Sequence, residues 1–206
     1  MFVVTYNVTH HSGVFYGATS VVDGTRVADW LDLLTPVAVL GPLSVFLGSR
    51  RPGAKWWAVF AAAAFLYIQG HAIHLAANSV SNVIDPNDDA VATVHLWDEV
   101  VGHYEWYAGL YLALLAVVAA LHRSVLPVNR WVLIGAGAIS GLTWATNGLE
   151  GGTAIFSLVL AASGVAYLIV HRRGAALAVG AAGIVATLVL VVYGLWHGGF
   201  PQPSAL

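Results

Sequence analysis

Six long apolar runs, separated by short polar breaks, constrain the fold of this chain more than any other feature of its sequence. A helix that crosses the hydrocarbon core of a bilayer needs about 20 mostly apolar residues, and each run meets that length. The breaks carry Pro, Gly and Asn, which favour tight turns between antiparallel neighbours. The sequence therefore predicts an all-α integral membrane protein, a bundle of six transmembrane helices. The runs cover residues 28–48, 55–80, 95–121, 131–149, 153–170 and 175–197.

The predicted transmembrane domain covers residues 28–198 and leaves little chain outside it. Residues 1–27 are expected to form an extracytoplasmic segment at the membrane surface, with a disordered tail as the alternative, and residues 199–206 form a short C-terminal tail. The N-terminal segment lacks the positively charged start and continuous apolar core of a cleavable signal peptide. Only 9% of the residues are charged, against about 25% in soluble domains, which fits a protein surrounded by the lipid bilayer.

Charged residues are divided between the two ends of the expected helices. Of the eight Lys and Arg residues, all but Arg26 lie in the loops that follow the first, third and fifth runs. Short loops rich in Lys and Arg stay on the cytoplasmic side, so both termini are expected to be extracytoplasmic. Most acidic residues lie at the opposite ends of the runs. The net charge of −2 gives no reason to expect nucleic acid as a partner.

Histidines also gather in the outer halves of the expected helices. Five of the nine lie there, namely His71, His74, His95, His103 and His197, whereas His122 and His171 lie at the cytoplasmic edge. At a rise of about 1.5 Å per residue, His74 and His103 on neighbouring antiparallel helices are expected at the same depth. His95, Glu99 and His103 are spaced by four residues and form one stripe on the third helix. Ionisable side chains within membrane helices usually face the bundle interior and mark function.

Polar side chains at three further helix ends are expected to face the same outer pocket. Glu150 ends the fourth run, His197 ends the sixth, and Asp29 and Asp32 open the first. If the bundle closes, five helices direct nitrogen or oxygen donors to one place. The acidic side chains at helix ends have an alternative role as interfacial residues without catalytic function.

The chain contains no cysteine, so thiolate ligands, disulfides and iron–sulfur clusters are excluded and a metal must be held by nitrogen or oxygen. Imidazole and carboxylate donors suit zinc, iron, copper or nickel. Zinc hydrolases use three protein ligands and an open position for an activated water. The candidate metal ligands are His71, His74, His103 and His197, and the candidate catalytic carboxylates are Asp98, Glu99 and Glu150. The sequence thus predicts a zinc hydrolase of a lipid-like or other apolar amide or ester.

The same residues leave other chemistry open. A hydrogen-bonded network without metal would also account for His74, Glu99 and His103. Two facing histidines suit a haem b, and the whole set of histidines and carboxylates suits copper or iron for oxygen chemistry. A metal or proton transporter is disfavoured because the inner halves of the runs are almost purely apolar. Helical spacing also leaves open which of Asp98 and Glu99 faces the pocket, since they project about 100° apart.

Three short patches carry much of this polar chemistry: "HAIHLAAN", "HLWDEV" and "YGLWHGG", with "ADWLD" at the start of the first helix. They resemble elements of the alkaline ceramidases and the related progestin/adiponectin receptor-like membrane hydrolases. The resemblance implies that His74 and His197 bind zinc, that Asp98 orients the zinc-bound water, and that calcium binds near Asp29 and Asp32. The chain departs from the family pattern by lacking a Ser one turn before His74. Ligands that face outward suit a prokaryotic cell membrane.

Overall fold

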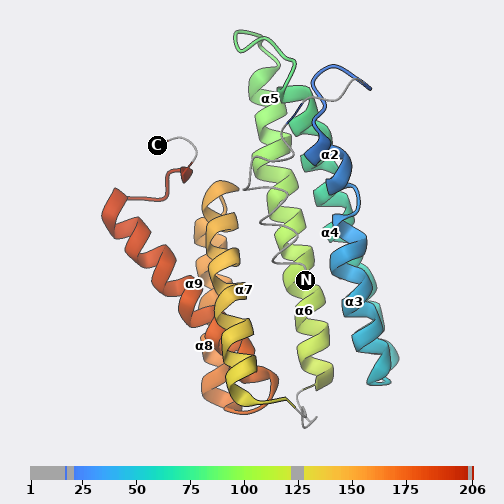
Figure 1. Ribbon diagram of the computed structural model, residues 1–206, viewed down its shortest axis with the longest axis vertical. Helices are drawn as coiled ribbons and strands as arrows, with labels where there is room; N and C mark the ends of the chain where they lie inside the picture. The colour runs from blue at the N-terminus through green and yellow to red at the C-terminus, as the bar shows by residue number, and fades with distance from the viewer. Residues whose placement is uncertain (1–16, 18–20, 122–127, 204–205) are drawn as a thin grey trace. The chain divides into compact units, whose positions relative to one another are not determined.

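The computed structural model describes residue 17 and residues 21–121, 128–203 and 206, which form helices and no strand (Figure 1). Most of the predicted N-terminal segment 1–27 lies outside these residues. The chain divides into two compact units, Met1–Val117 and Val118–Leu206, and each unit is described by itself. The single domain expected over residues 28–198 stays a prediction.

Among the described residues, five helices are long and apolar enough to cross a membrane. They are Val27–Ser49, Ala54–Ser81, Arg130–Glu150, Ala154–His171 and Ala175–His197. These helices match five of the predicted runs closely and are consistent with an integral membrane protein in a lipid bilayer. The third predicted run, 95–121, is helical but is not among the five, so the count of six spans stays a prediction.

In the described part of the first unit, the helices in chain order are first α2 (Val27–Asp32), α3 (Thr35–Ser49) and α4 (Ala54–Ser81). At the start of α2 the backbone N–H of Arg26 donates to Asp29 Oδ2 at 2.7 Å, which satisfies one of the free N–H groups of a helix end. The guanidinium of Arg26 pairs with the same carboxylate at 2.9 Å. The predicted first run is therefore divided into two successive helices by a turn at Leu33 and Leu34.

The third predicted run forms three successive helical segments: α5 (Val91–His95), the π-helix η1 (Leu96–Gly102) and α6 (His103–Leu121). This helix packs closely against α4 through glycines. A Cβ on Gly70 of α4 would overlap the backbone nitrogen of Trp106, and a Cβ on Gly109 of α6 would overlap the backbone nitrogen of Tyr67. The absence of side chains at these positions lets the two backbones touch, and this contact fixes the depth at which their polar side chains meet.

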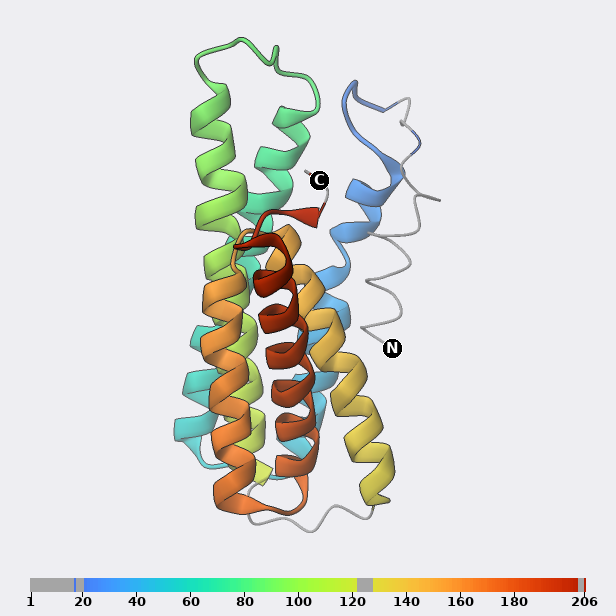
Figure 2. The same ribbon diagram turned by 90° about the vertical axis from the view of Figure 1, so that its left-hand side faces the viewer.

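The second unit consists of α7 (Arg130–Glu150), α8 (Ala154–His171) and α9 (Ala175–His197), which pack as neighbours (Figure 2). A tight turn joins α7 to α8, and in it the backbone N–H of Thr153 donates to the carbonyl of Gly148 at 2.9 Å. This turn confirms the prediction that a short break carrying Asn and Gly joins two neighbouring helices. Small residues again allow close approach, since a Cβ on Gly141 would overlap the carbonyl oxygen of Ala182.

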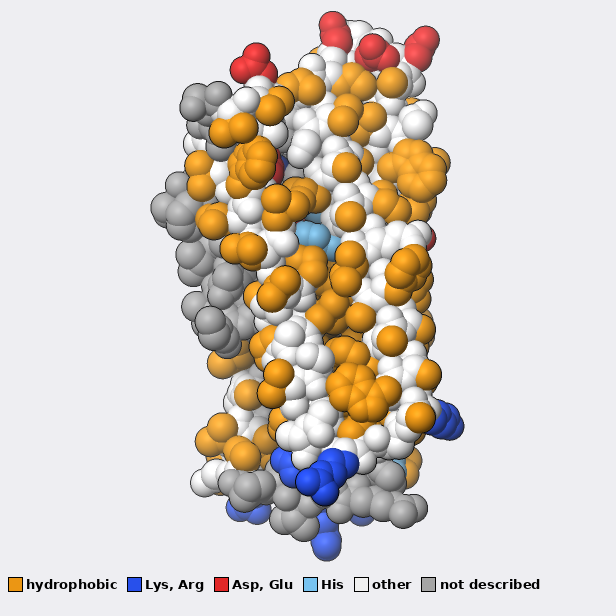
Figure 3. Space-filling model, turned by 90° about the vertical axis from the view of Figure 1, so that its right-hand side faces the viewer, with side chains coloured by type: hydrophobic (Ala, Val, Ile, Leu, Met, Phe, Trp, Pro, Cys, Tyr) orange, Lys and Arg blue, Asp and Glu red, His pale blue; other side chains and the backbone are white. Residues whose placement is uncertain are grey.

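The two ends of α4 differ in charge, as the predicted orientation requires. The exposed residues Arg50, Arg51 and Lys55 lie where α3 joins α4, and the exposed residues Asp85, Asp88 and Asp89 lie where α4 joins α5. Figure 3 shows Lys and Arg at one end, Asp and Glu at the other, and hydrophobic side chains between them. The backbone and side-chain N–H groups of Asn87 donate to Asp85 Oδ1 at 2.9 and 3.1 Å, which lowers the pKa of that carboxyl.

Candidate functional site

The first unit brings together two histidines and an aspartate from α4, η1 and α6. His74 Nδ1 lies 2.6 Å from Asp98 Oδ1, and the two side chains are only 15% and 9% exposed. The pair meets at ion-pair distance, but its atoms are not aligned as a directed hydrogen bond. The imidazole of His103 lies beside that of His74, with ring centroids 4.4 Å apart. The two imidazoles that depth counting places at one level are therefore in contact.

His103 also has its Nδ1 atom next to a carboxylate. That nitrogen lies 3.3 Å from the backbone carbonyl oxygen of Glu99 and 3.4 Å from its Oε2 atom. The side chain of His103 is buried and that of Glu99 is 25% exposed. In both histidines, Nδ1 is the nitrogen that faces an acidic partner, and Nε2 is the nitrogen left for another ligand.

The π-helix explains how both neighbouring acids reach this place. A π-helix closes its hydrogen bonds over five residues and widens the turn, and such segments are frequent at functional sites. The wider turn of η1 directs Asp98 towards α4, while Glu99 stays beside His103. Glu99 lies beside His103, as their four-residue spacing predicts, whereas Asp98 is buried against His74 and His95 is exposed.

A second histidine–aspartate pair lies one turn away on α4. His71 Nε2 is 3.2 Å from Asp32 Oδ2, and the two side chains are 3% and 4% exposed. Thr35 donates its hydroxyl to Asp32 Oδ1 at 2.6 Å. Both aspartates predicted near a calcium ion thus have protein partners, since Asp29 pairs with Arg26. The calcium site stays a prediction, as does a role for His71 as a zinc ligand.

Trp106 lies at the centre of these pairs, although the spacing of the histidines and carboxylates does not single it out. Its side chain is 2% exposed, and its ring lies 4.9 Å from that of His71, 5.5 Å from His74 and 6.0 Å from His103, centroid to centroid. The fully buried Tyr67 packs edge-on against it at 6.0 Å. Trp106 follows His103 by three residues, so helical spacing could have placed it on the same face.

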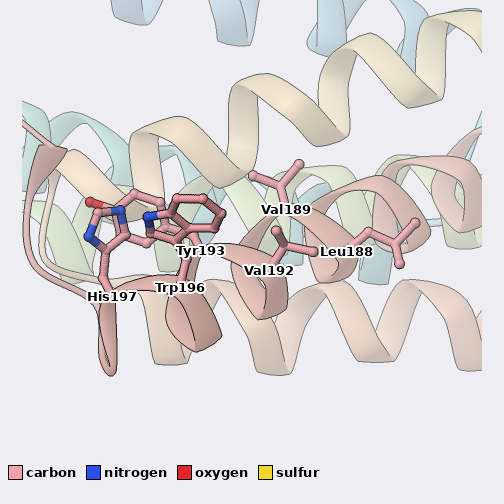
Figure 4. A pocket seen from close by; sticks show the side chains of 6 residues that line it. All are labelled: Leu188, Val189, Val192, Tyr193, Trp196 and His197. Carbon is pink, nitrogen blue, oxygen red and sulfur yellow. The ribbon is translucent and has the colours of Figure 1, made fainter.

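Glu150 and His197 belong to the second unit. Glu150 is half-buried at the end of α7, and its backbone carbonyl accepts a hydrogen bond from Gln202 Nε2 at 2.7 Å. His197 is exposed at the end of α9, and its ring lies 4.4 Å from that of Tyr193. The two rings border an open groove of about 490 Å³ that continues along α9 past Leu188, Val189, Val192 and Trp196 (Figure 4). The predicted catalytic and zinc-binding roles of Glu150 and His197 stay predictions.

In the part of the chain that the structure describes, no group of three or more His, Asp or Glu side chains is arranged to hold a metal ion. The side chains meet as histidine–carboxylate pairs, and two of these pairs are joined by the contact between His74 and His103. This donor set is smaller than the predicted set of four histidines.

Comparisons of the chain with protein-family models, with curated proteins and with solved structures find no match. The resemblance to the alkaline ceramidases and their relatives stays a hypothesis from three sequence patches. Any functional assignment therefore depends on the geometry of the first unit.

Proposed function

We propose that the protein is a membrane-embedded, zinc-dependent hydrolase of lipid-like amides or esters, with His74 and His103 as zinc ligands. The observation that supports it is the contact between these two imidazoles, each with a carboxylate beside its Nδ1 atom. Histidines that bind metal usually place their other ring nitrogen against a carboxylate or a carbonyl, which fixes the ring and raises its basicity. In this arrangement the Nε2 atom of each histidine would hold the zinc ion.

The neighbouring carboxylates complete the site. Zinc in a hydrolase takes three protein ligands and a water, and a carboxylate nearby accepts the proton of that water. Asp98 contacts the Nδ1 atom of His74, so we assign it as the buried carboxylate that orients this ligand and offsets part of the charge of the zinc ion. Glu99 is more exposed, so it is assigned as the base that faces the substrate and the water. The zinc ion, when bound, polarises the substrate carbonyl and activates the water.

The proposal includes a place in the membrane. The helix over residues 91–121 is the sixth span, both termini are extracytoplasmic, and the site opens to the outer leaflet of a prokaryotic cell membrane. The division of charge between the two ends of α4 supports this orientation, because loops rich in Lys and Arg stay on the cytoplasmic side. A site within the outer leaflet is reached by molecules that partition into lipid, which is why an apolar amide or ester is the substrate.

Metal analysis of the purified protein tests the proposal. We expect about one zinc per chain, as in a mononuclear hydrolase site, and no visible absorption band. The zinc-loaded protein should cleave fluorescent N-acyl or O-acyl lipid analogues in micelles, and a chelator should stop the cleavage until zinc is restored. Protein that binds no metal, or zinc-loaded protein that cleaves neither class of analogue, would contradict the proposal.

The two carboxylates give a prediction that separates binding from catalysis. Asp98→Asn is expected to weaken zinc binding by at least about 10-fold, the lower end of what loss of an orienting partner costs. Glu99→Gln should keep zinc but slow hydrolysis by about 100-fold or more, because loss of a general base typically costs 10²–10⁴-fold. Zinc titration and initial rates measure the two effects. If both variants lose zinc equally, the roles assigned to the two acids are wrong.

A redox function is the second candidate, and the position of Trp106 favours it. An indole that touches both proposed ligands and Tyr67 suits a site where copper or iron exchanges electrons. Haem b fits less well, because axial histidines lie on opposite faces of the porphyrin and ring centroids 4.4 Å apart leave no room for it. Copper or iron in the purified protein, with oxygen consumption instead of hydrolysis, would favour this candidate.

A further inference from the structure

The indole of Trp106 packs against the imidazoles of His71, His74 and His103, and it is roughly parallel to two of them. The imidazole of His103 is inclined by 15° to the indole and that of His74 by 30°, so both are roughly stacked on it. The imidazole of His71 meets the indole at 83°, edge to face. Because aromatic pairs hold preferred offset-stacked or edge-to-face geometries, a fixed indole restrains the planes of the rings around it.

A chain of side-chain contacts connects the indole of Trp106 to α2. His71 packs against Trp106 and against Tyr67, whose ring lies parallel to it at 6.2 Å. Asp32 of α2 contacts the Nε2 atom of His71, and Thr35 holds the carboxylate of Asp32. These side chains are buried, apart from the half-buried Thr35. In a close-packed interior, displacement of one ring requires its neighbours to move.

We infer that packing against Trp106 fixes the orientation of the imidazole rings of His74 and His103. The Asp32–His71 pair in turn holds the indole of Trp106 in position. In this assignment His71, Asp32 and Trp106 are positioning residues and not metal ligands. The consequence for zinc binding rests on the proposed function, whereas the positioning itself does not. Through Asp32, helix α2 thereby affects the geometry of a site formed by α4, η1 and α6.

Nuclear magnetic resonance of histidine-labelled protein in micelles tests the inference without any metal. The ring signals of His74 and His103, assigned by their disappearance in His74→Gln and His103→Gln, report the indole through its ring current. We expect Asp32→Asn and His71→Gln to shift both signals while the protein stays folded. Trp106→Leu should move them further, and Trp106→Phe should restore them in part because it retains an aromatic face.

The matched control is Asp29→Asn, which changes a neighbouring acid of α2 that pairs with Arg26 instead of His71. It should leave both ring signals unchanged. The inference is wrong if Asp32→Asn and His71→Gln also leave them unchanged, and Trp106→Phe decides the matter if Trp106→Leu does not fold. In zinc titrations Asp32→Asn and His71→Gln should bind zinc about 10-fold more weakly than the wild-type protein, as for the loss of an orienting partner. Wild-type protein that binds no zinc would refute the proposed function alone, because the ring signals still test the positioning.

Discussion

Replacement of His74 or His103 by Ala is expected to abolish zinc binding and hydrolysis together. Each variant removes one of the two imidazole donors that the structure places in contact. The affinity loss should exceed about 100-fold, because removal of a partner that only orients a ligand already costs 10–100-fold. Since ligands of one metal act as a unit, the double variant should be no less active than either single variant. Zinc content after dialysis and the initial rate of hydrolysis measure both effects.

The control for this pair is His171→Ala. His171 is exposed at the end of α8, where its ring packs on Tyr167, and the sequence predicts it at the cytoplasmic edge. His122, for which the same behaviour is predicted, lies outside the described residues. The His171→Ala variant should keep zinc and activity at the wild-type level. Equal zinc retention in His74→Ala, His103→Ala and His171→Ala would remove both ligands from the assignment.

The helices of this chain were predictable because the hydrocarbon core demands long apolar runs, and their ends carry Gly, Pro, Asn and charge. The contact between His74 and His103 was also predictable. The depth of each residue in the membrane follows from the constant rise per residue of a helix. The π-helix is not predictable from residue spacing, because faces and depths follow from spacing only where a helix keeps 3.6 residues per turn. That single departure decides where Asp98 points, and it places both acids of "DEV" beside histidines.

The partner of His71 could not be predicted for a different reason. His71 shares a face with His74, so spacing alone favours both histidines as ligands of one metal ion. The spacing does not show that Trp106 contacts both of them. The contact between Asp32 and His71 joins residues that are distant in the chain and depends on how α2 packs against α4. The pattern of apolar residues therefore predicts the helices, but it does not predict which side chains of two packed helices point towards each other.

The largest structural effect is expected from Gly70→Ala. A methyl group there would lie 2.7 Å from the carbonyl oxygen of Gly102 and would overlap the backbone of Trp106, so α4 and α6 must move apart. Overpacking of this kind typically costs about 1–3 kcal/mol, and contact with backbone atoms places the cost at the upper end. His74 lies one turn from Gly70, so the same movement separates it from Asp98 and His103. Zinc affinity should fall at least about 10-fold, as when an orienting contact is lost.

Gly41→Ala is the matched control, because a Cβ on Gly41 of α3 meets no atom within 4 Å. In a helix that substitution should be neutral or stabilise the protein by about 0.4–1 kcal/mol, through the lower entropy of the unfolded chain. Thermal unfolding in micelles and zinc titration compare the two variants. If Gly70→Ala unfolds at the temperature of Gly41→Ala and binds zinc as tightly, then close contact between α4 and α6 does not build the site. A lower unfolding temperature with weaker zinc binding in Gly70→Ala alone would tie the geometry of the histidines to the glycine contact that holds these helices together.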